Sequence, residues 1–232
     1  MGASVAIFFL SSFAIGGLLM LERRCVGQMA FVQPLAILLI AGFVVGAPAP
    51  ALWLGVTLQL LATGQTHYCN WVLVAVSAAF SLIALQRWGV VVQPGDAPTL
   101  AVLAFSTIWG IASFQFDKWL ARKDNAVVEL LPHGVSEETV EPFIRLVHRR
   151  VARNLLISGL QSVLAVGLSV LAGLAAHIWL PAPNPVALSV MQMAIPAFGV
   201  VAVLSSLVDW RFTSVAAATA LLSTAWWMWG MP

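Results

Sequence analysis

Long apolar stretches, separated by short polar or proline-containing segments, dominate the chain. Residues 4–21 contain no charged side chain, and residues 28–86 contain no Asp, Glu, Lys or Arg. A helix of about 20 apolar residues, rising about 1.5 Å per residue, crosses the roughly 30 Å hydrocarbon layer of a bilayer. Inside that layer only helices and closed barrels satisfy the backbone, and the period-two alternation of barrel strands is absent. The pattern therefore predicts transmembrane helices.

The pattern predicts an all-α integral membrane protein with about seven to eight hydrophobic segments. The segments cover residues 4–21, 29–46, 51–63, 71–92, 100–116, 154–179, 186–208 and 212–229. Residues 47–50 read Ala-Pro-Ala-Pro, and neither proline has a backbone N–H. Because residues 51–63 are short for a complete crossing, we expect a proline-broken helical hairpin at 29–63. This hairpin either crosses the bilayer or re-enters the side from which it came.

Composition supports a membrane location. Hydrophobic residues make up 61% of the chain and charged residues 9%, with a mean hydropathy of +0.96. Soluble domains carry about 25% charged residues, so this chain has too few to cover a globule in water. The first segment lacks the basic flank and small-residue cleavage site of a signal peptide, so we expect it to be a retained helix.

The basic residues are concentrated in residues 117–153. Seven of the eleven Lys and Arg residues lie there: Lys118, Arg122, Lys123, Arg145, Arg149, Arg150 and Arg153. Membrane-flanking loops rich in Lys and Arg remain on the cytoplasmic side. We therefore expect a basic cytoplasmic loop at 117–153, between a membrane region at 1–116 and a C-terminal three-helix membrane region at 154–232.

Counting segments outward from that loop places both termini outside. The turns at 93–98 and 181–185, which lack Lys and Arg, then also lie outside. The remaining basic residues that fall on the inside are Arg23, Arg24 and Arg211. Arg87, near the outer end of its helix, departs from the rule. A re-entrant hairpin leaves this arrangement unchanged because both of its ends stay inside.

The basic loop itself contains an amphipathic pattern. Its apolar positions recur at helical spacing with arginines between them: Val140, Phe143, Ile144, Val147 and Val151. One interpretation is an amphipathic helix lying on anionic lipid headgroups. The other is a docking helix for a soluble partner.

Polar residues within the apolar region gather near the ends of the hairpin. They are Glu22, Gln28, Gln33, Gln59, Gln65, Thr66, His67 and Asn70. Polar groups at membrane depth are costly and mark binding or transport sites, especially beside broken helices. Amide and carboxylate groups bond well to adjacent hydroxyls, so we predict a substrate site for a polyhydroxylated ligand. Alternatively, single glutamines such as Gln33 and Gln59 bond only to neighbouring helices. His177 and Gln192 are isolated, and we interpret them as structural.

The sequence offers no catalytic constellation. It lacks a Walker sequence, a Gly-rich dinucleotide turn, an HExxH motif and paired Cys or His ligands. We therefore predict no enzyme activity, no cofactor and no metal site. The net charge of +2 arises from basic residues beside membrane segments and does not indicate a nucleic-acid partner.

Several motifs occur in a recognisable order. The first is Gln33-Pro34-Leu35, followed by Gly42 to Gly46 and by Leu-Gly-Val-Thr-Leu-Gln-Leu-Leu-Ala-Thr-Gly at 54–64. Residues 116–122 and 192–200 continue the series. Together these motifs resemble the IIC permease component of the mannose/fructose/sorbose family of the phosphoenolpyruvate-dependent sugar phosphotransferase system. The resemblance covers nearly the whole chain, which would be a divergent member.

The resemblance implies a translocation subunit of the bacterial cytoplasmic (inner) membrane. Such a subunit binds a hexose-type sugar and passes it inward for phosphorylation by a soluble IIB subunit. It pairs with a IID membrane subunit, and IIA and IIB carry the phosphate on histidines. Two pairs of glycines suit a helix face for IID, although the same glycines could instead pack helices within this subunit. They are Gly42 with Gly46 and Gly159 with Gly167.

One departure from the family favours a second function. After the hairpin the family continues with a Pro-Asp pair near its sugar, whereas residues 65–71 here read Gln-Thr-His-Tyr-Cys-Asn-Trp. A non-transporting membrane scaffold or regulatory subunit that keeps the permease fold is therefore the alternative. Adjacent IIA, IIB and IID reading frames would favour transport.

The topology is testable with a cysteine at Asn125, in the basic stretch. Because residues 117–153 should be cytoplasmic, Asn125→Cys should resist an impermeant thiol reagent in intact cells and react after permeabilisation. Ala182→Cys, in a turn expected outside, is the control that should react in intact cells. Labelling of Asn125→Cys in intact cells would contradict the orientation.

Overall fold

The computed structural model describes residues 2–25, 33–64, 69–129, 137–180 and 184–207. Every regular element in this part of the chain is a helix, which confirms the all-α fold class. The helices are α1 (Gly2–Cys25), α2 (Pro34–Val45), α3 (Pro48–Gly64), α4 (Trp71–Arg87), α5 (Ala97–Glu129), α6 (Glu137–Trp179) and α7 (Pro185–Leu207).

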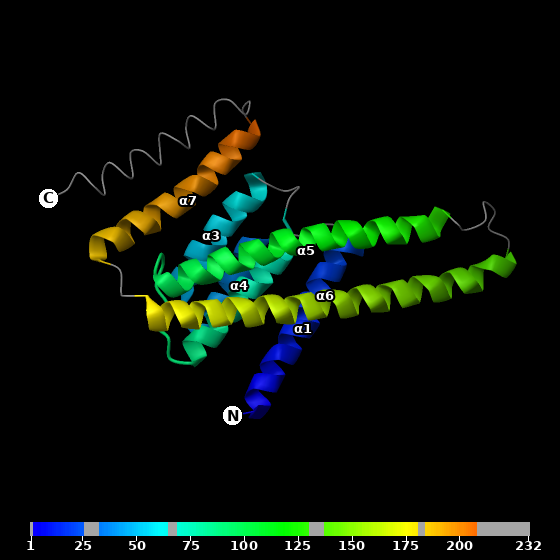
Figure 1. Ribbon diagram of the computed structural model, residues 1–232, viewed down its shortest axis with the longest axis horizontal. Helices are drawn as coiled ribbons and strands as arrows, with labels where there is room; N and C mark the ends of the chain where they lie inside the picture. The colour runs from blue at the N-terminus through cyan, green and yellow to red at the C-terminus, as the bar shows by residue number, and fades with distance from the viewer. Residues whose placement is uncertain (1, 26–32, 65–68, 130–136, 181–183, 208–232) are drawn as a thin grey trace.

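Helix α4 lies at the centre of the bundle (Figure 1). It packs against α1, α2, α3, α5 and α6. All of its residues from Trp71 to Leu85 are buried except Phe80 and Ile83, which are partly buried. A helix that is apolar on all sides requires protein or lipid around its full circumference. Here neighbouring helices enclose it.

Helices α5 and α6 form a long antiparallel pair that extends beyond the other helices (Figure 1). They have 33 and 43 residues, so only residues 130–136 of the predicted basic loop lie outside both helices, and also outside the described residues. The amphipathic segment around Val147 is the first part of α6 and not a separate helix. Residues 117–129 contain good helix formers and neither Gly nor Pro, so the helix does not stop where the apolar stretch ends.

Helices α2 and α3 form the predicted hairpin, with a tighter turn than the sequence indicated. Gly46 has a left-handed φ of 70°, and the Ala47 N–H donates to the Gly42 carbonyl at 2.9 Å. Pro48 then begins α3, where its missing N–H costs nothing because no intrahelical acceptor exists there. The 12 residues of α2 rise only about 18 Å. This is short of the roughly 30 Å hydrocarbon layer.

Helix α7 is hydrogen-bonded to α3 at the point where a proline interrupts the backbone hydrogen bonds of α7. Pro196 lies inside α7 and has no N–H to donate to the Gln192 carbonyl one turn earlier. The Trp53 indole Nε1 donates to that carbonyl at 2.9 Å, and Gln192 Nε2 donates to the Pro94 carbonyl at 2.8 Å. Gln192 therefore has a structural role, as predicted.

Outward-facing apolar side chains support a membrane location. Three helical stretches are long and apolar enough to cross a bilayer: Ala97–Arg122, Val147–Trp179 and Pro185–Val203. One face of α6 presents five leucines that are 42% to 63% exposed, namely Leu156, Leu160, Leu164, Leu168 and Leu171. Soluble proteins rarely expose such a continuous apolar stripe. The predicted eighth segment, 212–229, lies outside the described residues.

The glycines expected at a partner interface lie mostly inside this subunit. A Cβ at Gly42 would collide with Ala51 of α3, and one at Gly159 would lie 2.5 Å from the Phe13 ring of α1. Gly46 ends α2, and Gly167 is near Phe9. The packing within the subunit therefore accounts for Gly42 and Gly159. These two glycines do not indicate a IID interface.

Gly16 allows α1 to approach α6 closely, and we expect Gly16→Ala to destabilise the bundle. The new Cβ would lie 2.5 Å from Ser162 Cβ, and overpacking of this kind costs about 1–3 kcal/mol. Gly167→Ala is the matched control, because its Cβ would lie 4.0 Å from Phe9 while gaining about 1 kcal/mol of helix propensity. Unfolding in mixed micelles measures both. Equal stability of the two variants would contradict close α1–α6 packing.

Candidate functional site

The start of α4 is held against α5 by Asn70. Its side-chain Oδ1 caps α4 by accepting from the Leu73 N–H at 3.4 Å, and its backbone N–H donates to the Gly110 carbonyl at 3.0 Å. A side chain at Gly110 would collide with Val74, so glycine is what permits this approach. The Asn70 side chain is consequently brought inside the bundle, where it is 2% exposed.

Asn70 is part of a polar cluster that joins three helices. Its Nδ2 donates to Asp117 Oδ2 at 3.1 Å and to Ser113 Oγ at 3.4 Å, both on α5. Ser113 Oγ in turn donates to Gln161 Oε1 of α6 at 3.2 Å. Ser113 and Gln161 are 4% and 8% exposed, and Asp117 is partly buried. We call Asn70, Ser113, Asp117 and Gln161 the polar cluster.

The same face of α6 carries two further polar groups that have unmet hydrogen-bonding capacity. Ser158 and Asn154 precede Gln161 by one and two turns, and Ser158 is fully buried. Ser158 Oγ and Asn154 Oδ1 have no hydrogen-bond partner within the described part of the chain. A buried polar atom without a partner costs about 1–3 kcal/mol. These two atoms therefore carry unused hydrogen-bonding capacity near the polar cluster.

The helix register places Ser158 level with Asp117 and Asn154 about one turn further along. Ser106 pairs with Ser169 and Ser113 with Gln161 along the antiparallel α5 and α6. Continuing that register by one turn sets Asp117 level with residues 157–158. The polar cluster and Ser158 thus occupy adjacent turns of the same helix pair.

Other interhelical polar contacts are complete in themselves. Ser12 and Ser162 hydroxyls lie 3.1 Å apart between α1 and α6, and Ser162 Oγ also donates to the Ser12 carbonyl at 2.9 Å. Ser106 and Ser169 hydroxyls lie 3.0 Å apart between α5 and α6. Such pairs hold membrane helices together and leave little capacity for a ligand. They provide natural controls for the polar cluster.

The structure places the sequence-predicted site residues in different surroundings. Gln59 Oε1 accepts from the Leu35 N–H at 3.5 Å, closing the hairpin beside the exposed Gln33. Glu22 lies in α1, and Asn70 joins the polar cluster. Gln28, Gln65, Thr66 and His67 lie outside the described residues. Asn70 is therefore the predicted residue that the structure brings together with further polar side chains.

Ser113, Asp117 and Gln161 were not among the predicted site residues. Asp117 was assigned to the basic loop, and the other two were passed over inside apolar helices. The i, i+4 spacing of Ser113 and Asp117 was the available signal, because it puts both on one face of a helix. Together the side chains offer amide, hydroxyl and carboxylate groups, a set suited to binding hydroxyls. Among the described residues, no three His, Cys, Asp or Glu side chains are grouped to hold a metal ion.

No protein-family model, curated protein or solved structure matches this chain.

The coupling between Asn70 and Asp117 is measurable with a double-mutant cycle. Asn70→Ala removes a helix cap and leaves Asp117 without that donor. We therefore expect it to lower the free energy of unfolding by about 2 kcal/mol. The double variant Asn70→Ala/Asp117→Ala should lose about 1 kcal/mol less unfolding free energy than the two single variants added together, because the bond between the two side chains can be lost only once. Asn70→Ala combined with Ser106→Ala should be additive. Additivity in both cycles would contradict the Asn70–Asp117 interaction.

Proposed function

We propose that this chain is the membrane translocation subunit of a sugar phosphotransferase system. It binds a hexose-type sugar within the membrane and passes it inward. The observation that carries the proposal is the polar cluster, Asn70–Ser113–Asp117–Gln161, together with the unpartnered Ser158 Oγ and Asn154 Oδ1. The ordered motifs that resemble the IIC component support the same function independently of the site.

The chemistry of the cluster suits a sugar because adjacent hydroxyls both donate and accept. Asp117 is a strong acceptor, Ser158 can donate or accept, and the amides of Asn154 and Gln161 add both kinds of group. Each bond adds about 1 kcal/mol net, so four bonds give about 4 kcal/mol, equivalent to a Kd of about 1 mM. Affinity in this range permits selection of the sugar and also its release into the cytoplasm.

The remaining steps belong to partners under this proposal. The chain has no phosphorylation site of its own, and phosphoryl transfer to the sugar occurs on a soluble IIB subunit supplied by IIA. A IID membrane subunit completes the permease in the bacterial cytoplasmic membrane. Since Gly42 and Gly159 are used within this subunit, the exposed leucine face of α6 is the better surface for IID.

Asp117→Asn tests the site in the chain coexpressed with its IID and IIB candidates. The substitution preserves side-chain shape but replaces a carboxylate acceptor, so hexose affinity and coupled phosphorylation should fall about tenfold. Ser106→Ala is the matched control, because it removes a buried interhelical bond on the same two helices outside the cluster. It should change affinity by less than about twofold.

Three results would count against the site or the function. Equal affinity of Asp117→Asn and wild type would exclude the polar cluster as the site. Loss of binding in Gln59→Leu alone would move the site to the α2–α3 hairpin, as the sequence first indicated. Absence of hexose binding and phosphorylation in wild type with all partners present would overturn the transport proposal.

The alternative is a non-transporting scaffold or regulatory subunit with the same fold. The structural roles of Asn70 and Gln59 favour it, since Asn70 caps α4 and Gln59 closes the hairpin. For a scaffold, the cluster would serve only to bind α4, α5 and α6 together. The wild-type hexose-binding measurement separates the two functions, because a scaffold would assemble with partners without binding sugar.

A further inference from the structure

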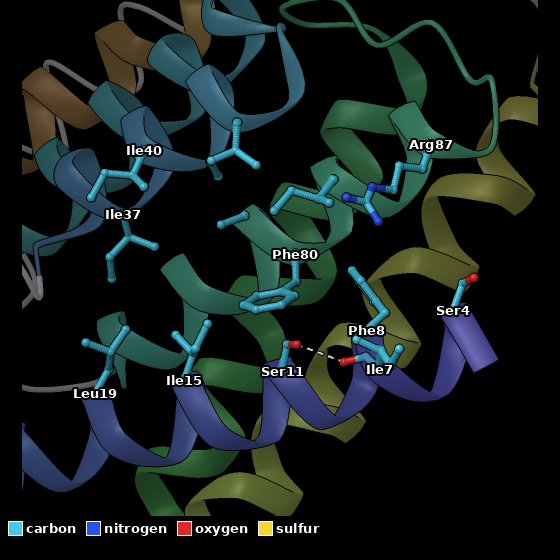
Figure 2. A pocket seen from close by; sticks show the side chains of 14 residues that line it. Ser4, Ile7, Phe8, Ser11, Ile15, Leu19, Ile37, Ile40, Phe80 and Arg87 are labelled. Carbon is cyan, nitrogen blue, oxygen red and sulfur yellow. Dashed lines mark hydrogen bonds between the residues drawn. The ribbon is translucent and has the colours of Figure 1, made fainter.

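An apolar groove runs between α1, α2 and α4 (Figure 2), and no residue of the polar cluster lines it. Its volume is about 520 Å³. Binding sites for small molecules commonly measure roughly 300–1,000 Å³. Ile7 and Ile15 of α1 face Ile37 and Ile40 of α2 across it. The groove is therefore large enough for a ligand and almost entirely hydrocarbon in character.

The groove extends along α1 over a length that matches an extended acyl chain. It is lined along α1 from Ser4 to Leu19, a rise of about 22 Å. One leaflet of the hydrocarbon layer is about 15 Å thick, so the groove accommodates an acyl chain of that depth. Phe8 and Phe80 line it and pack edge to face, with ring centroids 5.4 Å apart. The Ser11 hydroxyl donates to the Ile7 carbonyl of its own helix, so it needs no hydrogen-bond partner from a ligand.

One end of the groove carries a cation. Figure 2 shows Arg87, in the last turn of α4, reaching over the groove at the end where Ser4 lies. Arg87 has no ion-pair partner within the described part of the chain. Asp96, the nearest acid along the sequence, is occupied: its carboxylate accepts from the Gln93 and Thr99 N–H groups at 2.7 and 2.8 Å. Arg87 is exposed, so its guanidinium is accessible to an anion from another molecule.

We propose that this groove binds one acyl chain of an anionic phospholipid whose phosphate pairs with Arg87. An apolar channel that ends in a guanidinium with no ion-pair partner among the described residues is complementary to a molecule with a long hydrocarbon tail and a negatively charged head. This complementarity also accounts for Arg87 itself, the basic residue that departs from the distribution of the others. The inference is independent of sugar transport and depends only on the membrane location of the chain.

The test compares lipid binding by purified full-length protein in neutral detergent. Phosphatidylglycerol should bind about fivefold more tightly than phosphatidylcholine with matched chains. Both lipids carry the phosphate, but the choline cation of phosphatidylcholine offsets its charge, and one arginine beside a net negative headgroup contributes about 1 kcal/mol. The preference should disappear in Arg87→Gln and persist in Arg87→Lys. Arg122→Gln removes the same charge from an exposed position on α5, outside the groove, and should keep the preference.

The position of the lipid is tested with phosphatidylglycerol that carries a photoreactive group in its acyl chain. Cross-links in wild type should fall on the groove faces of α1, α2 and α4, and Arg87→Gln should lose them several-fold. Equal binding of the two lipids by wild type, or an unchanged preference in Arg87→Gln, would overturn the proposal. Cross-links elsewhere would also overturn it, as would groove residues shielded by a second protein chain in native membranes.

Discussion

The segment just before α4 is fastened to one face of α5, and the arrangement of the bundle depends on this contact. Cys69 Sγ lies 3.9 Å from the Thr107 carbonyl, and the Asn70 N–H donates to the Gly110 carbonyl. The Asn70 side chain continues the series to Ser113 and Asp117. These contacts follow α5 at intervals of three or four residues, so they fix both the depth and the rotation of α4. With α4 in place, the helices that enclose it have a common surface to pack against.

Interruptions of helical hydrogen bonding at membrane depth are repaired locally. An unsatisfied carbonyl has no water to bond to in hydrocarbon, so each break needs a donor from the protein. At Pro196 the donor is the Trp53 indole, and at the end of α2 it is the Ala47 N–H. The first repair binds α3 to α7, and the second closes the turn that leads from α2 into α3. Proline and glycine therefore determine which helices are neighbours, in addition to where each helix ends.

Hydrophobic patterning predicted the helices well because it depends on residues close together in the sequence. Local residues predicted both turns. Pro48 indicated the turn of the hairpin, where Gly46 ends α2, and Gly95 indicated the turn at 93–96. The continuation of α5 through Lys118 and Arg122 was missed, because charge was interpreted as the end of the helix. Helix propensity, which is high for Lys and Arg, was the better guide there.

The candidate site was less predictable because it depends on how separate helices face one another. Asn70 was singled out by its residue type, whereas its partners Ser113, Asp117 and Gln161 come from α5 and α6, whose relative register a single sequence does not contain. The glycines illustrate the same limit: Gly159 indicated close packing correctly, but its partner is Phe13 of the same chain. Composition identifies which residues need partners, and only the fold supplies them.

The unbroken passage of α5 and α6 beyond the apolar region gives the protein a mechanical property. Residues 118–129 of α5 and 143–158 of α6 contain neither proline nor glycine, so both helices run without such a break over this length. Two helices packed along their length resist bending far better than one. A tilt imposed on this stretch of the pair is therefore transmitted to the level of Asp117 and Ser158 with little bending of the helices.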